Sequence, residues 1–127
     1  MSYNVLIIED AYLESLVFAQ QLDKVGFHIV HLFKPEILFE EYDITLFDII
    51  ITDISLVDSI DGYEVCRRIK QMQLGIPIIV RSFSMEFQEE IDKAYLYGAS
   101  STISKGAKIE ELVEMIDRLC RPHESKN

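Results

Sequence analysis

Short apolar runs alternate along the chain with longer segments whose apolar residues recur at helical spacing. The runs are apolar throughout instead of alternating with polar residues, a pattern typical of strands that are covered by helices on both faces of a sheet. We predict five such strands, at residues 5–8, 27–32, 47–52, 76–80 and 101–104, of which the second is the weakest.

The segments between the strands are predicted to be helices. Apolar residues at helical spacing outline a helix that ends near Gly26, one over residues 63–72 that ends near Gly75, and one that ends at Gly98. Glycine after the last turn is a common C-terminal stop of a helix. The segment 35–43 has the weakest helical pattern. The last helix has the clearest apolar stripe, formed by Ile109, Leu112, Val113, Ile116, Leu119 and Cys120.

This alternation of strands and helices defines the fold class. Crossover connections make neighbouring strands parallel and the βαβ units right-handed. The predicted fold is therefore an open, doubly wound α/β sheet. In such sheets ligands bind at the carboxyl ends of the strands, where the order of the strands reverses. The residues that follow each strand are therefore the candidates for chemistry.

Length and charge limit the classes of function. The 127 residues fit one domain, and we assign residues 1–121 to it and residues 122–127 to a polar tail. Twelve Lys and Arg against twenty-two Asp and Glu give a formal charge of −10. This charge argues against nucleic acids and anionic membranes as partners, because both are bound through cations. The apolar runs are also far shorter than the roughly 20 residues that cross a bilayer.

The cysteines, histidines and N-terminus indicate a cytoplasmic protein without a histidine or cysteine metal site. Cys66 and Cys120 belong to no metal-binding or redox spacing, so both are expected to be reduced thiols. No secretory signal is visible in the first ten residues, which contain an acidic pair. His28 and His31 lie three apart on a predicted strand, which places them on opposite faces and argues against a two-histidine metal site.

Polar residues follow four of the predicted strands. Glu9 and Asp10 follow the first, Asp53 the third, Ser82 the fourth and Lys105 the fifth. Each has an ordinary explanation alone, since acids favour helix N-termini, serine caps helices and lysine is commonly solvated. Together they indicate a shared site, because Asp53 ends a central strand where an unpaired carboxylate is costly.

This set of residues is sufficient for phosphoryl transfer. Clustered carboxylates repel one another, and Mg²⁺, which prefers oxygen ligands and phosphate, relieves that repulsion. A carboxylate beside the metal can act as a nucleophile on phosphorus and form an acyl phosphate. An ammonium and a hydroxyl then stabilise the equatorial oxygens of the loose transition state. We therefore predict phosphoryl transfer onto Asp53.

From Val5 to about Leu119 the chain resembles the receiver domains of two-component response regulators, of the CheY-like type. Several of that family's motifs occur in the family's order, and Asp61-Gly62 matches the pair that opens its third helix. The resemblance implies a flavodoxin-like, five-stranded parallel sheet in the order 2-1-3-4-5 with five helices. The motifs are Glu9-Asp10 in LIIED, Asp53 in IIITDIS, Ser82 in PIIVRS and Lys105 in GASSTISK.

The resemblance also implies a role for each residue of the site. Asp53 would be the phosphoacceptor, assisted by Ser82 and Lys105. The donor would be a sensor histidine kinase or a phosphotransfer protein. The fourth helix, fifth strand and fifth helix would make output contacts or a homodimer. Such a chain is a signalling domain and not an enzyme with a separate substrate. Direct Mg²⁺ ligands would be Asp10, Asp53 and the backbone carbonyl of Ser55, with Glu9 acting mostly through water.

The chain departs from the family at four places. The loop after Asp53 reads ISLVDSIDG, which lacks the usual Met-Pro and is one residue longer than the common spacing. Phe83 stands where the family has a small residue, and its ring is expected to narrow access to Asp53. Thr102 replaces the aromatic residue that commonly swings inward on activation. Gly106 follows Lys105 in place of proline, so a trans peptide is expected.

Three other functions share features with this sequence. A haloacid-dehalogenase-type phosphohydrolase needs a second Asp two residues after the nucleophile, where this chain has Ser55. A flavodoxin-like flavin binder needs a Ser/Thr/Gly-rich loop after the first strand, where Glu9 and Asp10 would repel a phosphate. A receiver-like module that docks partners without being phosphorylated fits the altered neighbours of the site, and it is the main alternative.

Overall fold

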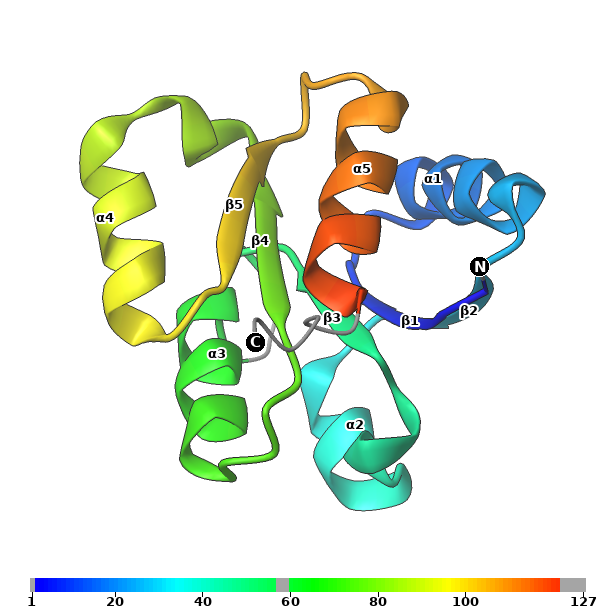
Figure 1. The fold of residues 1–127 in the computed structure, drawn as a ribbon. Helices are drawn as coiled ribbons and strands as arrows, with labels where there is room; N and C mark the ends of the chain where they lie inside the picture. The colour runs from blue at the N-terminus through cyan, green and yellow to red at the C-terminus, as the bar shows by residue number, and fades with distance from the viewer. Residues whose placement is uncertain (1, 57–59, 122–127) are drawn as a thin grey trace, which may run out of the picture.

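The computed structural model describes residues 2–56 and 60–121, apart from the side chain of Tyr12. Over this part of the chain, five parallel strands form one sheet in the order β2-β1-β3-β4-β5. This order confirms the predicted flavodoxin-like topology (Figure 1). The strands are β1 (Asn4–Ile8), β2 (His28–Leu32), β3 (Ile49–Thr52), β4 (Ile78–Ser82) and β5 (Ser101–Ser104). The helices are α1 (Tyr12–Val25), α2 (Pro35–Glu41), α3 (Gly62–Gln71), α4 (Gln88–Tyr97) and α5 (Ile109–Cys120), with short 3-10 helices η1 (Ile44–Leu46) and η2 (Phe83–Glu86).

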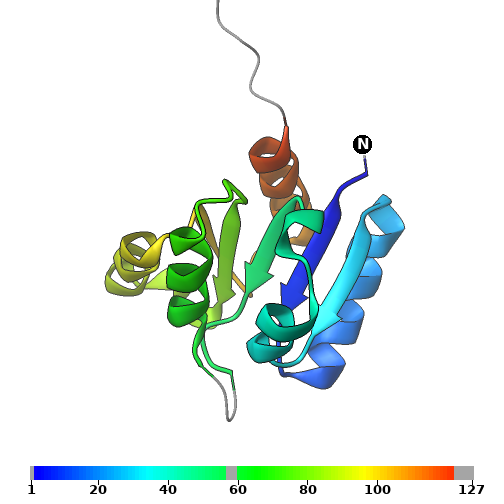
Figure 2. The ribbon, with the colours of Figure 1, turned by 90° about the horizontal axis from the view of Figure 1, so that it is seen from below.

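Helices cover both faces of the sheet, and each face has its own apolar core. On one face, Phe18 and Leu22 of α1 and Leu112 and Ile116 of α5 pack against the strands. On the other face, α2, α3 and α4 pack against the alternate strand residues (Figure 1, Figure 2). All four residues of β3 are buried, as the uninterrupted apolar run predicts. The doubly wound prediction is therefore confirmed.

Glycines end two of the helices as predicted. Gly26 after α1 has φ 104° and Gly98 after α4 has φ 114°, a left-handed conformation that glycine adopts without a Cβ clash. The helix predicted over residues 63–72 is α3 to within one residue at each end, but the expected stop near Gly75 was wrong, because the helix ends at Gln71. Gln73 already has φ 54°, so the chain leaves the helical conformation two residues before the glycine.

The edges of two strands also differ from prediction. Residues 47–48 precede β3, and β4 runs from Ile78 to Ser82 instead of starting at residue 76. Ser82 is therefore the last residue of a strand and does not follow it. The segment 35–43, which has the weakest helical pattern in the sequence, contains α2. This helix begins with Pro35, and the missing N–H of a proline costs nothing in the first turn of a helix.

The structure also bears on the predictions about the cysteines and about membrane-spanning segments. Cys66 is buried and Cys120 half-buried, and neither is in a disulfide. Burial raises the pKa of both thiols to about 12, so they stay protonated at neutral pH. No helix within residues 2–56 and 60–121 is long and apolar enough to span a membrane. The predicted polar tail, 122–127, lies outside the described residues.

Candidate functional site

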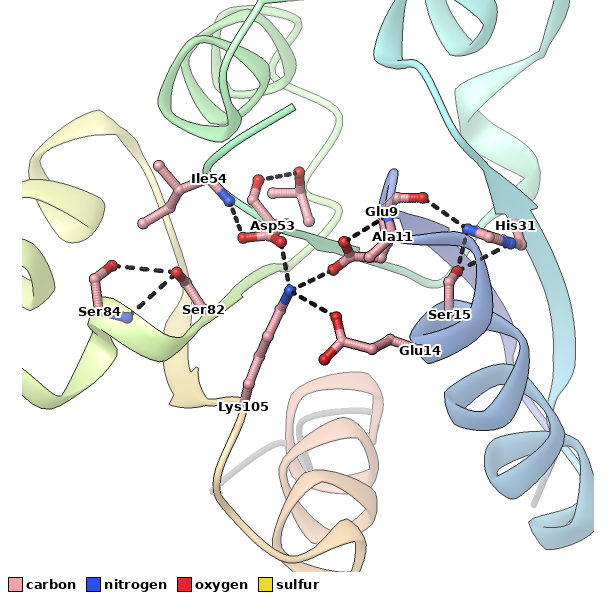
Figure 3. A network of polar contacts seen from close by, with 11 residues as sticks. Glu9, Ala11, Glu14, Ser15, His31, Asp53, Ile54, Ser82, Ser84 and Lys105 are labelled. Atoms are coloured by element: carbon pink, nitrogen blue, oxygen red, sulfur yellow. Dashed lines mark hydrogen bonds and ion pairs between the residues drawn. The ribbon is translucent and has the colours of Figure 1, made fainter. Parts of the chain in front are cut away.

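The carboxyl ends of the parallel strands bring the predicted charged residues together. Glu9 follows β1 and Asp53 follows β3, and the two residues are only 4% and 7% exposed. The strands pair with Ile8 beside Thr52, so the residues that come next lie beside each other. Lys105 follows β5 at the same edge of the sheet. The structure therefore places both carboxylates and the ammonium in one site (Figure 3).

The Lys105 ammonium lies between the two buried carboxylates. Its Nζ is 2.6 Å from Oδ2 of Asp53 and 2.8 Å from Oε2 of Glu9. Backbone N–H groups donate to the remaining oxygens, from Ile54 to Oδ1 of Asp53 at 2.6 Å and from Ala11 to Oε1 of Glu9 at 3.1 Å. Each carboxylate is therefore held on one side by a cation and on the other by the backbone.

These contacts shift the pKa values of the site. Burial raises the pKa of the Glu9 carboxyl, the hydrogen bond from Lys105 opposes that rise, and the neighbouring Asp53 adds to it. For Lys105, burial acts to lower the pKa, but the hydrogen bonds and charges of Asp53 and Glu9 outweigh burial and raise it. Lys105 is therefore a firmly charged ammonium at neutral pH.

The loop that carries Asp53 is fixed by its close approach to the start of α3. The N–H of Gly62 donates to the carbonyl of Ile54 at 2.8 Å. A Cβ at Gly62 would lie 2.0 Å from the carbonyl oxygen of Asp53, so the backbones can approach this closely only with glycine. The Asp61 carboxylate caps α3 by accepting the N–H of Glu64 at 2.9 Å. The Asp61-Gly62 pair thus holds the loop that follows Asp53 in place.

The other predicted site residues lie at the same edge but have different partners. The Ser82 hydroxyl is directed toward Ser84, with the two Oγ atoms 3.2 Å apart (Figure 3). It makes no hydrogen bond to Asp53 within the described part of the chain. Asp10 is half-buried beside Glu9, and Ser55 is exposed two residues after Asp53.

The departures from the family pattern can be located in the structure. The ring of Phe83 is 62% exposed, and its centroid is 5.6 Å from Nζ of Lys105, so this ring flanks the site. The half-buried Thr102 lies on β5. The Lys105–Gly106 peptide is trans, as expected, since residues 2–56 and 60–121 contain no cis peptide bond. Residues 57–59 of the longer loop lie outside the described residues.

Sequence reasoning missed three residues that surround the site. Glu14 on the first turn of α1 places Oε2 3.9 Å from Nζ of Lys105. The ring of His31 contacts the backbone carbonyl of Glu9 through Nε2 at 2.9 Å and is also hydrogen-bonded to the buried Ser15 hydroxyl. Arg81 on β4 is half-buried. Only Arg81 had a usable signal in the sequence, namely a charge between the apolar run 76–80 and the candidate site residue Ser82.

The oxygen donors at this edge have the chemistry that suits a hard divalent cation. They are the carboxylates of Asp10 and Asp53 and the carbonyl of Ser55, and Mg²⁺ prefers such ligands. In the described segments, no three His, Cys, Asp or Glu side chains converge in the geometry of a metal site. The ammonium of Lys105 instead occupies the space between Glu9 and Asp53. A cation at this edge would therefore compete with Lys105 for Asp53.

Comparison with known proteins defines the class to which this fold and site belong. The model of the response regulator receiver domain family matches residues 5–117. The chain therefore belongs to the response regulator receiver domain family. A response regulator from Chloroflexus aurantiacus has the same fold, with a TM-score of 0.86 and 21% identity over 96% of this chain and 100% of that one.

Two relatives are more similar in sequence but longer. The chain is 30% identical over 121 residues to the probable transcriptional regulator ycf29 of Porphyra purpurea, which covers 94% of this chain and 57% of that protein. It is 36% identical over 81 residues to the response regulator ArlR of Staphylococcus aureus, which covers 64% of this chain and 36% of that protein. The chain thus spans about half the length, or less, of these relatives.

Proposed function

We propose that residues 1–121 form a phosphoacceptor domain in which Asp53 receives a phosphoryl group from a phosphohistidine, in a Mg²⁺-dependent reaction. The observation that carries this proposal is the buried Asp53 carboxylate with the Lys105 ammonium 2.6 Å from its Oδ2. A receiver domain has a histidine kinase or a phosphotransfer protein as its natural donor. The acceptor residue is part of the domain itself, so we assign a signalling role and not an enzyme activity on a separate substrate.

The chemistry of transfer follows from the groups at the site. One oxygen of the Asp53 carboxylate attacks phosphorus, and an acyl phosphate P–O bond forms as the P–N bond to the donor histidine breaks. The electron pair of that bond stays on the imidazole nitrogen, which takes up one proton from solvent and leaves the donor histidine neutral. In the loose transition state, negative charge is spread over the three equatorial phosphoryl oxygens. The Lys105 ammonium, which already contacts Asp53, is placed to stabilise that charge. Ser82 could donate to another oxygen after turning from Ser84.

The resemblance and the chemistry of the oxygen donors support a proposed metal site. Asp10, Asp53 and the Ser55 carbonyl would hold Mg²⁺, and Glu9 would contribute mostly through water. When bound, Mg²⁺ neutralises charge on the acids and the phosphoryl group. The protein's own contribution is to hold Asp53 through Ile54 and Gly62 while it reacts. The family setting and the free thiols support a cytoplasmic location.

Output from the domain is proposed to go through protein contacts. The surface of α4, β5 and α5 is the proposed site of partner or homodimer contacts, and no direct contact with nucleic acid is proposed. Thr102 has no aromatic ring to swing inward, so the change on phosphorylation must run through other groups. The β4–α4 connection is one such route, because Ser82 and Ser84 are already hydrogen-bonded there.

The test of this function is phosphorylation of the purified chain with acetyl phosphate or a cognate kinase and Mg²⁺. We expect an acid-stable, hydroxylamine-labile adduct that is absent from Asp53→Asn. Asp23→Asn, which removes an exposed acid from α1, is the matched control and should be phosphorylated like the wild type. Persistence of the adduct in Asp53→Asn would sink the assignment.

A phosphorylation-silent interaction module is the second candidate. It is favoured by one observation: the Ser82 hydroxyl is hydrogen-bonded to Ser84 and, within the described part of the chain, not to Asp53. A silent module need not bind a metal. Titration with Mg²⁺ followed by amide shifts separates the two candidates, since saturable shifts at residues 9–10 and 53–55 support the phosphoacceptor. Unchanged amides throughout would favour the silent module.

A further inference from the structure

A second cation lies beneath the phosphoacceptor site. Arg81 is on β4 two residues after Ile79, so its side chain leaves the sheet on the same face, toward α1 and α5. Its guanidinium carbon is 4.0 Å from the ring centroid of Phe18, a buried residue of α1. This stacking holds the charge in one place, because the ring cannot move within the core.

Arg81 shares a cavity with the reactive carboxylates. A small cavity of about 10 Å³ is lined by Arg81 and Phe18 together with Glu9 and Asp53. On its other side Arg81 lines a wider hollow of about 330 Å³ between α1 and α5. Within residues 2–56 and 60–121 the guanidinium makes no ion pair and no hydrogen bond. It therefore acts on the acids across space and not through a direct contact.

The acids around Lys105 outnumber this one cation, so the pocket has an excess of negative charge that Arg81 can offset. Glu9, Glu14 and Asp53 surround Lys105, which alone cannot neutralise three acids. The same three acids also act on Arg81, where burial lowers the pKa of the guanidinium and their attraction opposes that fall. An arginine stays charged at any neutral pH, so the pocket carries a permanent second positive charge.

We propose that Arg81 is an electrostatic positioning residue that sets the ion affinities of the phosphoacceptor pocket. It weakens the binding of a divalent cation to the acids and strengthens the binding of an anionic group at Asp53. This inference rests on the proposed function, because it assumes that the same acids bind Mg²⁺. It goes further by assigning opposite effects on cation and anion to a residue that touches neither ion.

The test compares two substitutions at Arg81. Arg81→Met keeps an unbranched apolar stem against Phe18 and removes the charge, whereas Arg81→Lys keeps the charge. Arg118→Met removes one exposed cation from α5 and serves as the control with the same net charge as Arg81→Met. Mg²⁺ affinity is measured by calorimetry at low ionic strength, and beryllofluoride affinity is measured at saturating Mg²⁺ by amide shifts. Urea unfolding confirms that each variant is folded.

The expected result has two opposite signs. Arg81→Met should bind Mg²⁺ about tenfold more tightly, because one charge near a divalent ion at a partly solvated protein edge changes affinity by about that factor. The same variant should bind beryllofluoride more weakly. Arg81→Lys and Arg118→Met should stay close to the wild type. Added salt should shrink both effects only slightly, because the charge is partly buried.

The possible results distinguish failure of the inference about Arg81 from failure of the proposed function. Packing damage would weaken the binding of both Mg²⁺ and beryllofluoride. A loss of both affinities in Arg81→Met would therefore overturn the inference. Unchanged affinities in Arg81→Met, with a wild type that binds both ions, overturn it as well and leave the proposed function intact. A wild-type protein that binds neither ion overturns the proposed function, and the inference about Arg81 falls with it.

Discussion

Replacing Lys105 with methionine should destabilise the fold through charge and not through packing. Methionine keeps most of the volume of the lysine side chain but removes the ammonium that contacts both Glu9 and Asp53. In the wild type the side chains of Lys105, Asp53 and Glu9 are only 8%, 8% and 5% exposed. Removing one partner of such a buried group leaves an uncompensated charge, which costs more than the pair itself contributes.

The size of this effect can be estimated from the burial. Breaking a buried ion pair costs about 3–5 kcal/mol, and we take about 3 because the site opens at the sheet edge. A domain of 127 residues loses roughly 4 °C of melting temperature for each kcal/mol. Lys105→Met should therefore melt about 12 °C below the wild type at pH 7. Lys108→Met removes an exposed lysine nearby and should melt close to the wild type.

The pH dependence separates charge from packing. The pKa of Glu9 is raised by burial above its usual 4.5, so protonation of this carboxyl favours the folded state. Without the opposing hydrogen bond from Lys105 that pKa rises further, and the deficit of Lys105→Met should shrink as the pH falls from 7 toward 5. In the wild type, the raised pKa of Lys105 means that its contribution is complete below 10.5 and is lost as the pH rises from there through the raised pKa.

Urea unfolding at several pH values measures this deficit directly. Adding Glu9→Gln to Lys105→Met removes one of the two facing carboxylates and should recover much of the lost free energy of unfolding. A deficit below about 1 kcal/mol at pH 7, within the range of ordinary surface substitutions, would refute the reasoning. So would a deficit that stays constant down to pH 5, because a packing defect has no reason to depend on the protonation of Glu9.

Three further predictions concern the surroundings of the site. Gly62→Ala should lower the free energy of unfolding by more than about 2 kcal/mol, since its methyl would lie 2.0 Å from a backbone oxygen, whereas Gly106→Ala, whose nearest neighbour lies at 3.5 Å, should be tolerated in the same urea titration. Phe83→Ala should raise the rate of phosphorylation by acetyl phosphate, because the exposed ring flanks the site; an unchanged rate would disprove gating. Tyr63→Phe should cost about 1 kcal/mol in urea unfolding, because it removes the hydroxyl that donates to Glu90 of α4, and a neutral result would show that this contact contributes nothing.

Much of the fold follows from local pattern. Strands covered on both faces must be apolar throughout, which is why β3 and β5 were placed correctly to within two residues. Left-handed glycines at Gly26 and Gly98 marked helix ends because few other residues adopt that conformation. The end of α3 was misplaced because Gln73 adopts the same conformation without the sequence signal.

The site was predictable where topology alone decides position. Residues that follow parallel strands meet at one edge, so Glu9, Asp53 and Lys105 were found from their order. Contacts that depend on the direction of a side chain could not be predicted from the sequence. The Ser82 hydroxyl is hydrogen-bonded to Ser84. Arg81, whose side chain leaves the opposite face of β4, lines a cavity with Glu9 and Asp53. Such choices depend on packing partners from distant elements, which a sequence pattern does not contain.

The central claim is that the Asp53 carboxylate is the phosphoacceptor, and locating the phosphoryl group tests it most directly. The chain is phosphorylated with Mg²⁺ and a phosphohistidine donor, the acyl phosphate is trapped by reduction, and the peptides are mapped by mass spectrometry. The account predicts a single modified residue, Asp53, and no modification when Mg²⁺ is chelated. Modification at Asp10 or at any other acid, with Asp53 unmodified, would contradict it.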